Sequence, residues 1–94
     1  MNPLRGEGEV AGYRLRPTFQ RLVEAEGELG PLFALVERAA AGALSLGETA
    51  ALLWHCIEGE RPAREAFGEA LCAAGLANAT PALRTVLTQI LAGR

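Results

Sequence analysis

The stretch YRLRPTFQRLVEAEGELG, from Tyr13 to Gly30, changes its hydrophobic period halfway along. In YRLR an apolar side chain alternates with an arginine, which is the two-residue period of a half-buried strand. Pro17 ends that pattern because proline has no N–H to donate to a strand ladder. From Thr18, a good helix N-cap residue, apolar side chains recur at helical spacing until Gly30. The stretch therefore predicts a short extended arm followed by a helix.

The residues before Tyr13 leave open whether the arm forms a β-hairpin. A second strand is expected through GEGEV, residues 6–10, and only Ala11 and Gly12 separate it from YRLR. A two-residue type I′ loop requires positive φ at both positions, which Ala11 disfavours. We expect an N-terminal arm over residues 1–17, either extended or as a short hairpin.

Four further helices are expected, because start and stop signals follow one another within a few residues. The start signals are Pro31, a Ser45–Glu48 capping box, Pro62 and Thr80-Pro81, and the stop signals are Gly42, Gly59 and Gly75. The segment LGETAALLWHCIE, residues 46–58, is apolar around most of its circumference and is the expected central helix. The prediction is a mainly α fold. It is a compact bundle of four to five short helices over residues 18–94, forming one globular unit with the arm.

Composition narrows the class of protein. The 94 residues are 50% hydrophobic and 21% charged, which is typical of a globular domain. A net charge of −2 argues against a nucleic-acid binder that depends on phosphate contacts. The absence of an apolar run of membrane-spanning length and of a signal-peptide pattern predicts no membrane association and a cytoplasmic location. All basic residues are Arg and all acidic ones Glu, a coding bias that points to a bacterial host.

No catalytic, cofactor-binding or metal-binding residues are predicted. His55 is the only histidine, and we expect it to lie in or near the core with a ring nitrogen bonded to the backbone. Cys56 and Cys72 form no CxxC pair, and both are expected to be small buried hydrophobes with free thiols. Local ion pairs at helical spacing are expected between Glu60 and Arg64 and between Arg61 and Glu65.

The remaining signal is an excess of apolar side chains for so small a body, which is explained equally well by a surface groove for another helix or by simple burial. The expected groove residues are Trp54, Ile57 and Leu53, with Leu44 and Leu46 in the preceding loop. Tyr13, Leu15 and Phe19 are expected to fasten the arm to the helices, and the first two are also candidate partner contacts.

The segment GEVAGYRLRPTFQRLVEAEGELG resembles a family of small proteins from gene transfer agents and related prophages. The family pattern is G-E-V, then Y-x-L-R-P-T-F, then a helix ending in E-x-x-L-G. The matching residues are Gly8, Glu9, Val10, Tyr13, Leu15, Arg16, Pro17, Thr18, Phe19, Glu26, Leu29 and Gly30. LSLGETAALLWHCIEG and EALCAAGLANATPALRTVL resemble the later segments. This chain has fewer residues between G-E-V and the tyrosine than family members usually have.

The family is counted among phage tail assembly chaperones and is also labelled a tail tube component. The resemblance implies a non-enzymatic chaperone, without cofactor, that masks apolar helices of the tape measure protein. Three alternatives stay open. One is a structural tail tube subunit that contacts tail tube protein and forms homo-oligomers, and another is a small DNA-binding regulatory domain. The third is a small enzyme, which would require His55 or a cysteine to meet another polar group in an open cleft.

Overall fold

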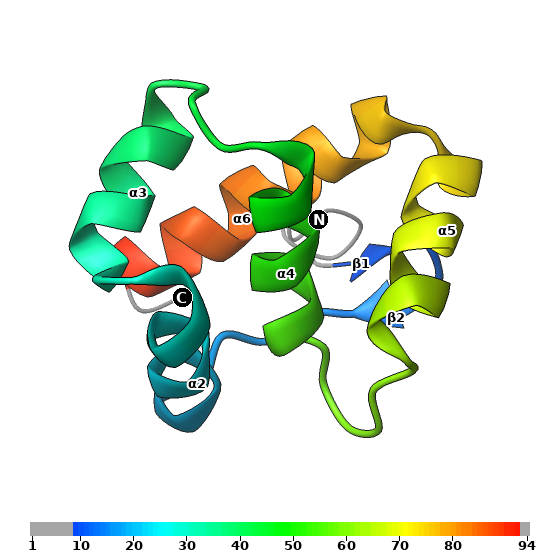
Figure 1. Ribbon diagram of the computed structural model, residues 1–94, viewed down its shortest axis with the longest axis horizontal. Coiled ribbons are helices and arrows are strands. Elements are labelled where there is room, and N and C mark those ends of the chain that lie inside the picture. Colours follow the sequence, from blue (N-terminus) through cyan, green and yellow to red (C-terminus); the bar gives the residue numbers. More distant parts are fainter. Residues whose placement is uncertain (1–8, 93–94) are drawn as a thin grey trace.

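Helix α4 (Leu46–His55) runs through the centre of the computed structural model, which describes residues 9–92 (Figure 1). It contacts helices on several sides, as expected of the most apolar helical segment. The surrounding helices are α2 (Phe19–Leu29), α3 (Leu32–Ala40), α5 (Arg64–Ala74) and α6 (Ala79–Ala92), with a 3₁₀ turn η1 (Leu76–Asn78) before α6. The predicted helical bundle is confirmed, and its described part measures 33 × 29 × 26 Å.

A short hairpin precedes the helices. Strand β1 (Glu9–Val10) pairs antiparallel with β2 (Tyr13–Arg14), and Val10 lies opposite Tyr13. The loop is the two-residue turn anticipated as unfavourable, with φ of 54° at Ala11 and 86° at Gly12. The hairpin therefore forms with a strained alanine. The expected strand residues 6–8 lie outside the described part of the chain.

The hairpin is fastened to the segment that follows α4. Leu15 makes an isolated antiparallel bridge with Ile57. The Arg16 N–H donates to the Cys56 carbonyl at 2.6 Å, and the Glu58 N–H donates to the Arg14 carbonyl at 2.8 Å. Through these contacts the extended arm pairs with residues 40 to 44 positions later in the chain.

Ring contacts complete the attachment of the arm. The Tyr13 ring packs edge-on against Phe67, with centroids 5.5 Å apart. Tyr13 and Leu15 thus hold the arm in place, as expected. Phe19 does not, because its side chain is 84% exposed at the start of α2.

Local signals set the ends of the helices. The Thr18 hydroxyl caps α2, and the Ser45–Glu48 capping box opens α4, as predicted. Pro31 is the N-cap of α3, one residue before the helix. Pro62 lies two residues before α5, so that helix begins later than expected. Gly30 and Gly75 take positive φ at the helix ends, the conformation that favours glycine.

The core lies between α4 and the elements around it. Its fully buried large side chains include Phe67, Leu35, Leu52, Leu53, Ile57, Leu71 and Val86. Alanines at close helix contacts, such as Ala25, Ala51 and Ala82, fill the narrower parts of this core. Small side chains allow short helices to approach closely, as the alanine-rich composition suggests.

Candidate functional site: a polar network and two apolar surfaces

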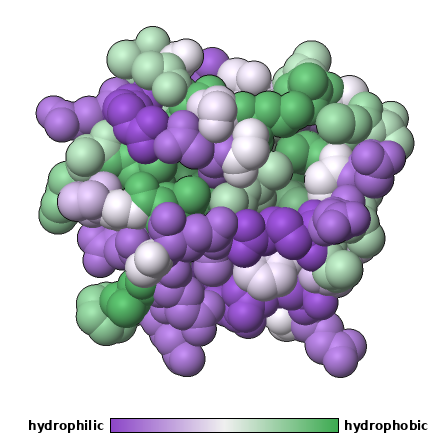
Figure 2. Space-filling model, viewed as in Figure 1, coloured by the Kyte–Doolittle hydropathy of each residue, from purple (hydrophilic) through white to green (hydrophobic). Residues whose placement is uncertain are grey.

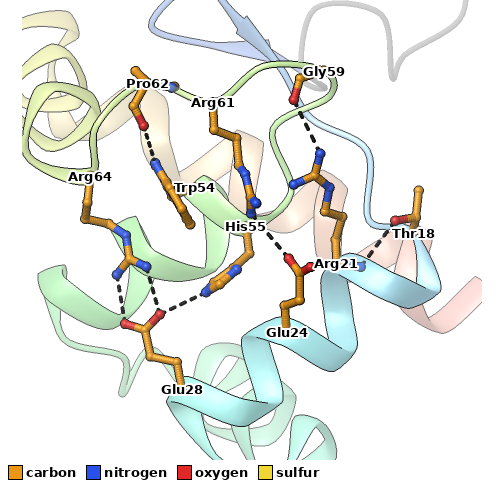
Figure 3. A network of polar contacts seen from close by, with 10 residues as sticks. All are labelled: Thr18, Arg21, Glu24, Glu28, Trp54, His55, Gly59, Arg61, Pro62 and Arg64. Carbon is orange, nitrogen blue, oxygen red and sulfur yellow. Dashed lines mark hydrogen bonds and ion pairs between the residues drawn. The ribbon is translucent and has the colours of Figure 1, made fainter.

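Glu28, near the end of α2, joins three helices (Figure 3). Its carboxylate accepts two hydrogen bonds from the Arg64 guanidinium, both 2.8 Å long, at the start of α5. It also bonds Nε2 of His55, the last residue of α4, at 2.9 Å. The arrangement fixes α2, α4 and α5 relative to one another.

Electrostatics keep Glu28 ionised. The two hydrogen bonds from Arg64, with a further one from His55, lower the Glu28 pKa to about 2. Because an ionised carboxylate only accepts hydrogen bonds, His55 must carry its proton on Nε2. The buried Nδ1 of His55 then has no hydrogen-bond partner among residues 9–92.

Trp54 lies between two arginines in the same network (Figure 3). The guanidinium carbons of Arg61 and Arg64 are each 4.3 Å from its ring centroid, a cation–π geometry. Its indole N–H donates to the Pro62 carbonyl at 2.9 Å. The half-buried ring is thus covered by its own chain.

The expected local ion pairs are replaced by pairs between elements. Arg61 pairs with Glu24 at 3.4 Å and Arg64 with Glu28, both on α2, instead of with neighbours in sequence. His55 lies in the core as expected, but it bonds a carboxylate and not the backbone. Because the network joins α2, α4 and α5, we interpret it as a structural clamp. Glu24 and Glu28 lie one turn apart on α2, so the sequence places them on one face, but it does not show which arginines that face meets.

The cysteines differ from each other. Cys56 is buried as expected, and desolvation raises its thiol pKa to about 12. Cys72, in contrast, is exposed on α5, which corrects the expectation that both are buried. Among residues 9–92, no cluster of His, Cys, Asp and Glu side chains has the arrangement needed to hold a metal ion.

The five predicted partner contacts lie mostly inside the molecule. Leu53, Ile57 and Leu15 belong to the core, each at most 6% exposed, because α4 and the hairpin bury them. Tyr13 and Trp54 are partly buried against that core. Partner binding by these side chains stays a prediction. None of the five lines the apolar surfaces described next.

One apolar surface lies between α3 and α6. We call it the α3/α6 face. It is a shallow groove of about 310 Å³, lined by Val36, Ala39, Ala40, Thr80, Leu83, Arg84, Leu87, Thr88 and Leu91. Leu91 is 64% exposed, and Arg84 is the only charged residue among the described residues of the lining.

A second apolar surface lies between α4 and α5. This α4/α5 groove has a volume of about 500 Å³ and is lined by Leu46, Gly47, Ala50, Glu65, Gly68, Glu69, Leu71 and Cys72. Figure 2 shows hydrophobic side chains between these helices at the upper right, above a hydrophilic band that crosses the face. Both charged lining residues are acidic.

A smaller depression of about 270 Å³ connects the two surfaces. It shares Leu46 with the α4/α5 groove and Ala39, Thr80 and Leu83 with the α3/α6 face. Leu44 and Leu46 line it, so two of the residues singled out from the sequence do border a groove. This continuous apolar surface makes the region a candidate site of protein contact.

A protein-family model described as "Phage tail tube protein, GTA-gp10" matches residues 7–93. The chain belongs to this family. The match confirms the relation to gene transfer agent and phage tail proteins that the arm and first helix suggest. The comparison with curated proteins and the comparison with solved structures gave no match.

The family description concerns a structural part of a phage tail, and contact with other tail proteins follows from it. In the described part of the chain, none of the helices has both the length and the hydrophobicity needed to cross a membrane.

Proposed function

We propose that this protein is a non-enzymatic structural component of a phage-type tail, as its family description suggests. The observation that supports this role most directly is the pair of exposed apolar surfaces on α3/α6 and α4/α5. A tail subunit must present such surfaces to neighbouring subunits. A tail assembly chaperone masking the tape measure protein was the main expectation from the sequence, and it remains the second candidate.

The chaperone alternative draws support from the shape of the α4/α5 groove. Three of its lining residues are glycine or alanine, namely Gly47, Ala50 and Gly68. They leave room for one helix of a partner such as the tape measure protein. A DNA-binding role has less support, because five of the seven arginines in residues 9–92 pair with glutamates.

The two tail roles differ in what remains in the finished particle. The test is to express the tail gene cluster with an affinity tag on this chain and to purify mature particles. Quantitative mass spectrometry then measures the ratio of this chain to the major tail protein. A structural subunit stays in the particle at a fixed ratio to that protein. Absence from mature tails, with presence in assembly intermediates, would support the chaperone instead.

A further inference from the structure

The two apolar surfaces carry opposite charges. Among residues 9–92, the charged residues that line the α4/α5 groove are Glu65 and Glu69, and the one charged residue that lines the α3/α6 face is Arg84. Within residues 9–92, none of these three side chains has an ion-pair partner. Figure 1 places α3 and α5 at opposite ends of the longest axis. The two surfaces are therefore unlike and complementary in charge, and both border the smaller depression between them.

We infer that the α3/α6 face of one copy docks into the α4/α5 groove of the next, with Arg84 beside Glu65 and Glu69. This inference rests on the proposed structural role and names the neighbouring subunit as a second copy of this chain. Contact between unlike faces leaves one of each free. Copies therefore add head to tail until a ring closes or a filament grows.

The shapes of the two surfaces permit this docking. Each is a shallow groove between two helices, so α6 of one copy fits between α4 and α5 of the next. In return, α5 fits between α3 and α6, as ridges of side chains fit grooves when helices pack. The charged residues lie on the two helices that enter the grooves of the other copy. Glu65 and Glu69 are on α5, and Arg84 is on α6.

Gly68 supports a close approach at the centre of the contact. It lies inside α5, where glycine costs about 1 kcal/mol relative to alanine. Among residues 9–92, no atom outside the neighbouring helix backbone lies within 4 Å of the position that a Cβ would occupy, so no contact in this part of the chain requires glycine there. A helix from another copy resting on this turn of α5 would require it.

The charges also disfavour the competing symmetric arrangement. If two α4/α5 grooves faced each other, Glu65 and Glu69 would oppose their own copies in an apolar environment. Like charges across an interface suppress the wrong partner. The pattern therefore selects unlike faces over like ones.

The test reverses these charges. Arg84→Glu and the double variant Glu65→Arg/Glu69→Arg are compared with wild type by sedimentation velocity over a range of protein concentrations. Wild type is expected to self-associate more weakly as salt rises, and each variant to raise the apparent dissociation constant about tenfold or more. Glu60→Arg, an exposed reversal outside both surfaces, is the matched control and should associate like wild type.

Mixing the two variants gives the decisive result. Each is repulsive toward itself, but every contact between one and the other joins opposite charges. An equimolar mixture should therefore recover the association of wild type, and so should the triple variant on one chain. Circular dichroism establishes that each variant is folded before it is compared.

The rate of chemical labelling of Cys72 reports whether the α4/α5 groove is covered. It is exposed and lines the α4/α5 groove, whereas Cys56 is buried and its thiol pKa is raised to about 12. Maleimide labelling of Cys72 should slow as wild-type concentration rises and stay fast in Arg84→Glu. Gly68→Leu, which fills the groove, should weaken association without unfolding the chain.

Three results would overturn the inference. They are a wild type that stays monomeric at every concentration, association that neither reversal changes, and full Cys72 reactivity in the oligomer. Protection of Cys72 only by a basic helical peptide from the tape measure protein would assign the groove to that partner instead. Absence of the chain from mature tails, with charge-dependent association intact, would reject the tail-subunit role and leave this inference standing. Presence of the chain in mature tails, with no charge-dependent association, would support the tail-subunit role and reject this inference.

Discussion

At the scale of single residues, Ala11 is strained because its turn requires a positive φ that alanine disfavours. Its φ of 54° lies in the left-handed region, which costs an alanine about 1 kcal/mol. Ala11→Asn matches the preferred type I′ sequence, so we expect it to raise the free energy of unfolding by about 0.5–1 kcal/mol. Urea titration followed by circular dichroism measures the change. Ala11→Val, which tolerates positive φ poorly, should lower the same quantity.

Glu28 makes stability depend on pH in the acid range. Its pKa is lowered from 4.5 to about 2 in the folded state, so its stabilising contribution is complete above pH 4.5. That contribution is lost as pH falls toward 2, where the folded carboxylate takes up its proton. We expect Glu28→Gln to be less stable than wild type at pH 6 and the difference to shrink toward pH 2. Urea unfolding across this range provides the measurement.

Part of the acid sensitivity should survive in Glu28→Gln. Hydrogen bonds, chiefly from Arg38, also lower the Glu48 pKa to about 2. The double variant Glu28→Gln/Glu48→Gln is therefore the control. Its free energy of unfolding should depend on pH still less than that of Glu28→Gln. A Glu28→Gln profile parallel to that of wild type would show that the clamp contributes nothing to the pH dependence.

At the scale of the elements, the capping box of α4 is the most informative target. The Ser45 hydroxyl accepts from the Glu48 N–H, and the Glu48 carboxylate accepts from the Ser45 N–H, both at 3.1 Å. Ser45→Ala removes one of these bonds and should cost about 1 kcal/mol, or roughly 4–8 °C in Tm. Thermal unfolding measures this loss. Ser45→Gly should cost only a few tenths of a kcal/mol, and equal losses would argue against the cap.

Gly27 weakens α2 without a contact that explains it. It is exposed inside the helix, and no atom lies within 4 Å of the position for a Cβ. Gly27→Ala should raise the free energy of unfolding by about 0.5–1 kcal/mol and leave self-association unchanged. Sedimentation and urea unfolding of this variant check both expectations. The substitution is thus a matched control for changes at Gly68.

The helices could be predicted because their ends are encoded locally. Thr18, Ser45 and Gly75 act through bonds within a few residues, and such signals are visible in sequence. The start of α5 was misplaced because Pro62 takes part in a loop that the Trp54 indole holds. Pairing of Arg61 and Arg64 with α2 was not predictable from helical spacing, because the fold brings those glutamates close.

The candidate surfaces were predicted only in part. Leu44 and Leu46 line the smaller depression, as their position before α4 suggested, although Leu44 also packs against the core. Leu53 was not available to a groove because the second half of α4 is buried, and Ile57 was not because it pairs with Leu15 of the arm. This burial follows from packing against α2, α5, α6 and the arm, which a single segment does not reveal.

At the scale of the whole molecule, the three phenylalanines distinguish the core from the surface. Phe67 is fully buried, whereas Phe19 and Phe33 are 84% and 75% exposed. Phe67→Ala should cost about 3–5 kcal/mol, and Phe33→Ser should change stability by less than about 0.5 kcal/mol. Denaturant unfolding distinguishes them. A large loss from Phe33→Ser would mean that α3 packs more deeply than described here.

The bridge between Leu15 and Ile57 imposes an order on events during synthesis. The hairpin is synthesised before α4, yet the backbone that pairs with it follows 40 to 44 residues later. Until Cys56, Ile57 and Glu58 have been synthesised, Leu15 and the backbone of Arg14 and Arg16 lack their partners. The arm gains further contacts only with Phe67 of α5 and with α6. A nascent chain halted before α4 is complete would therefore expose the apolar side chains of the arm to other proteins.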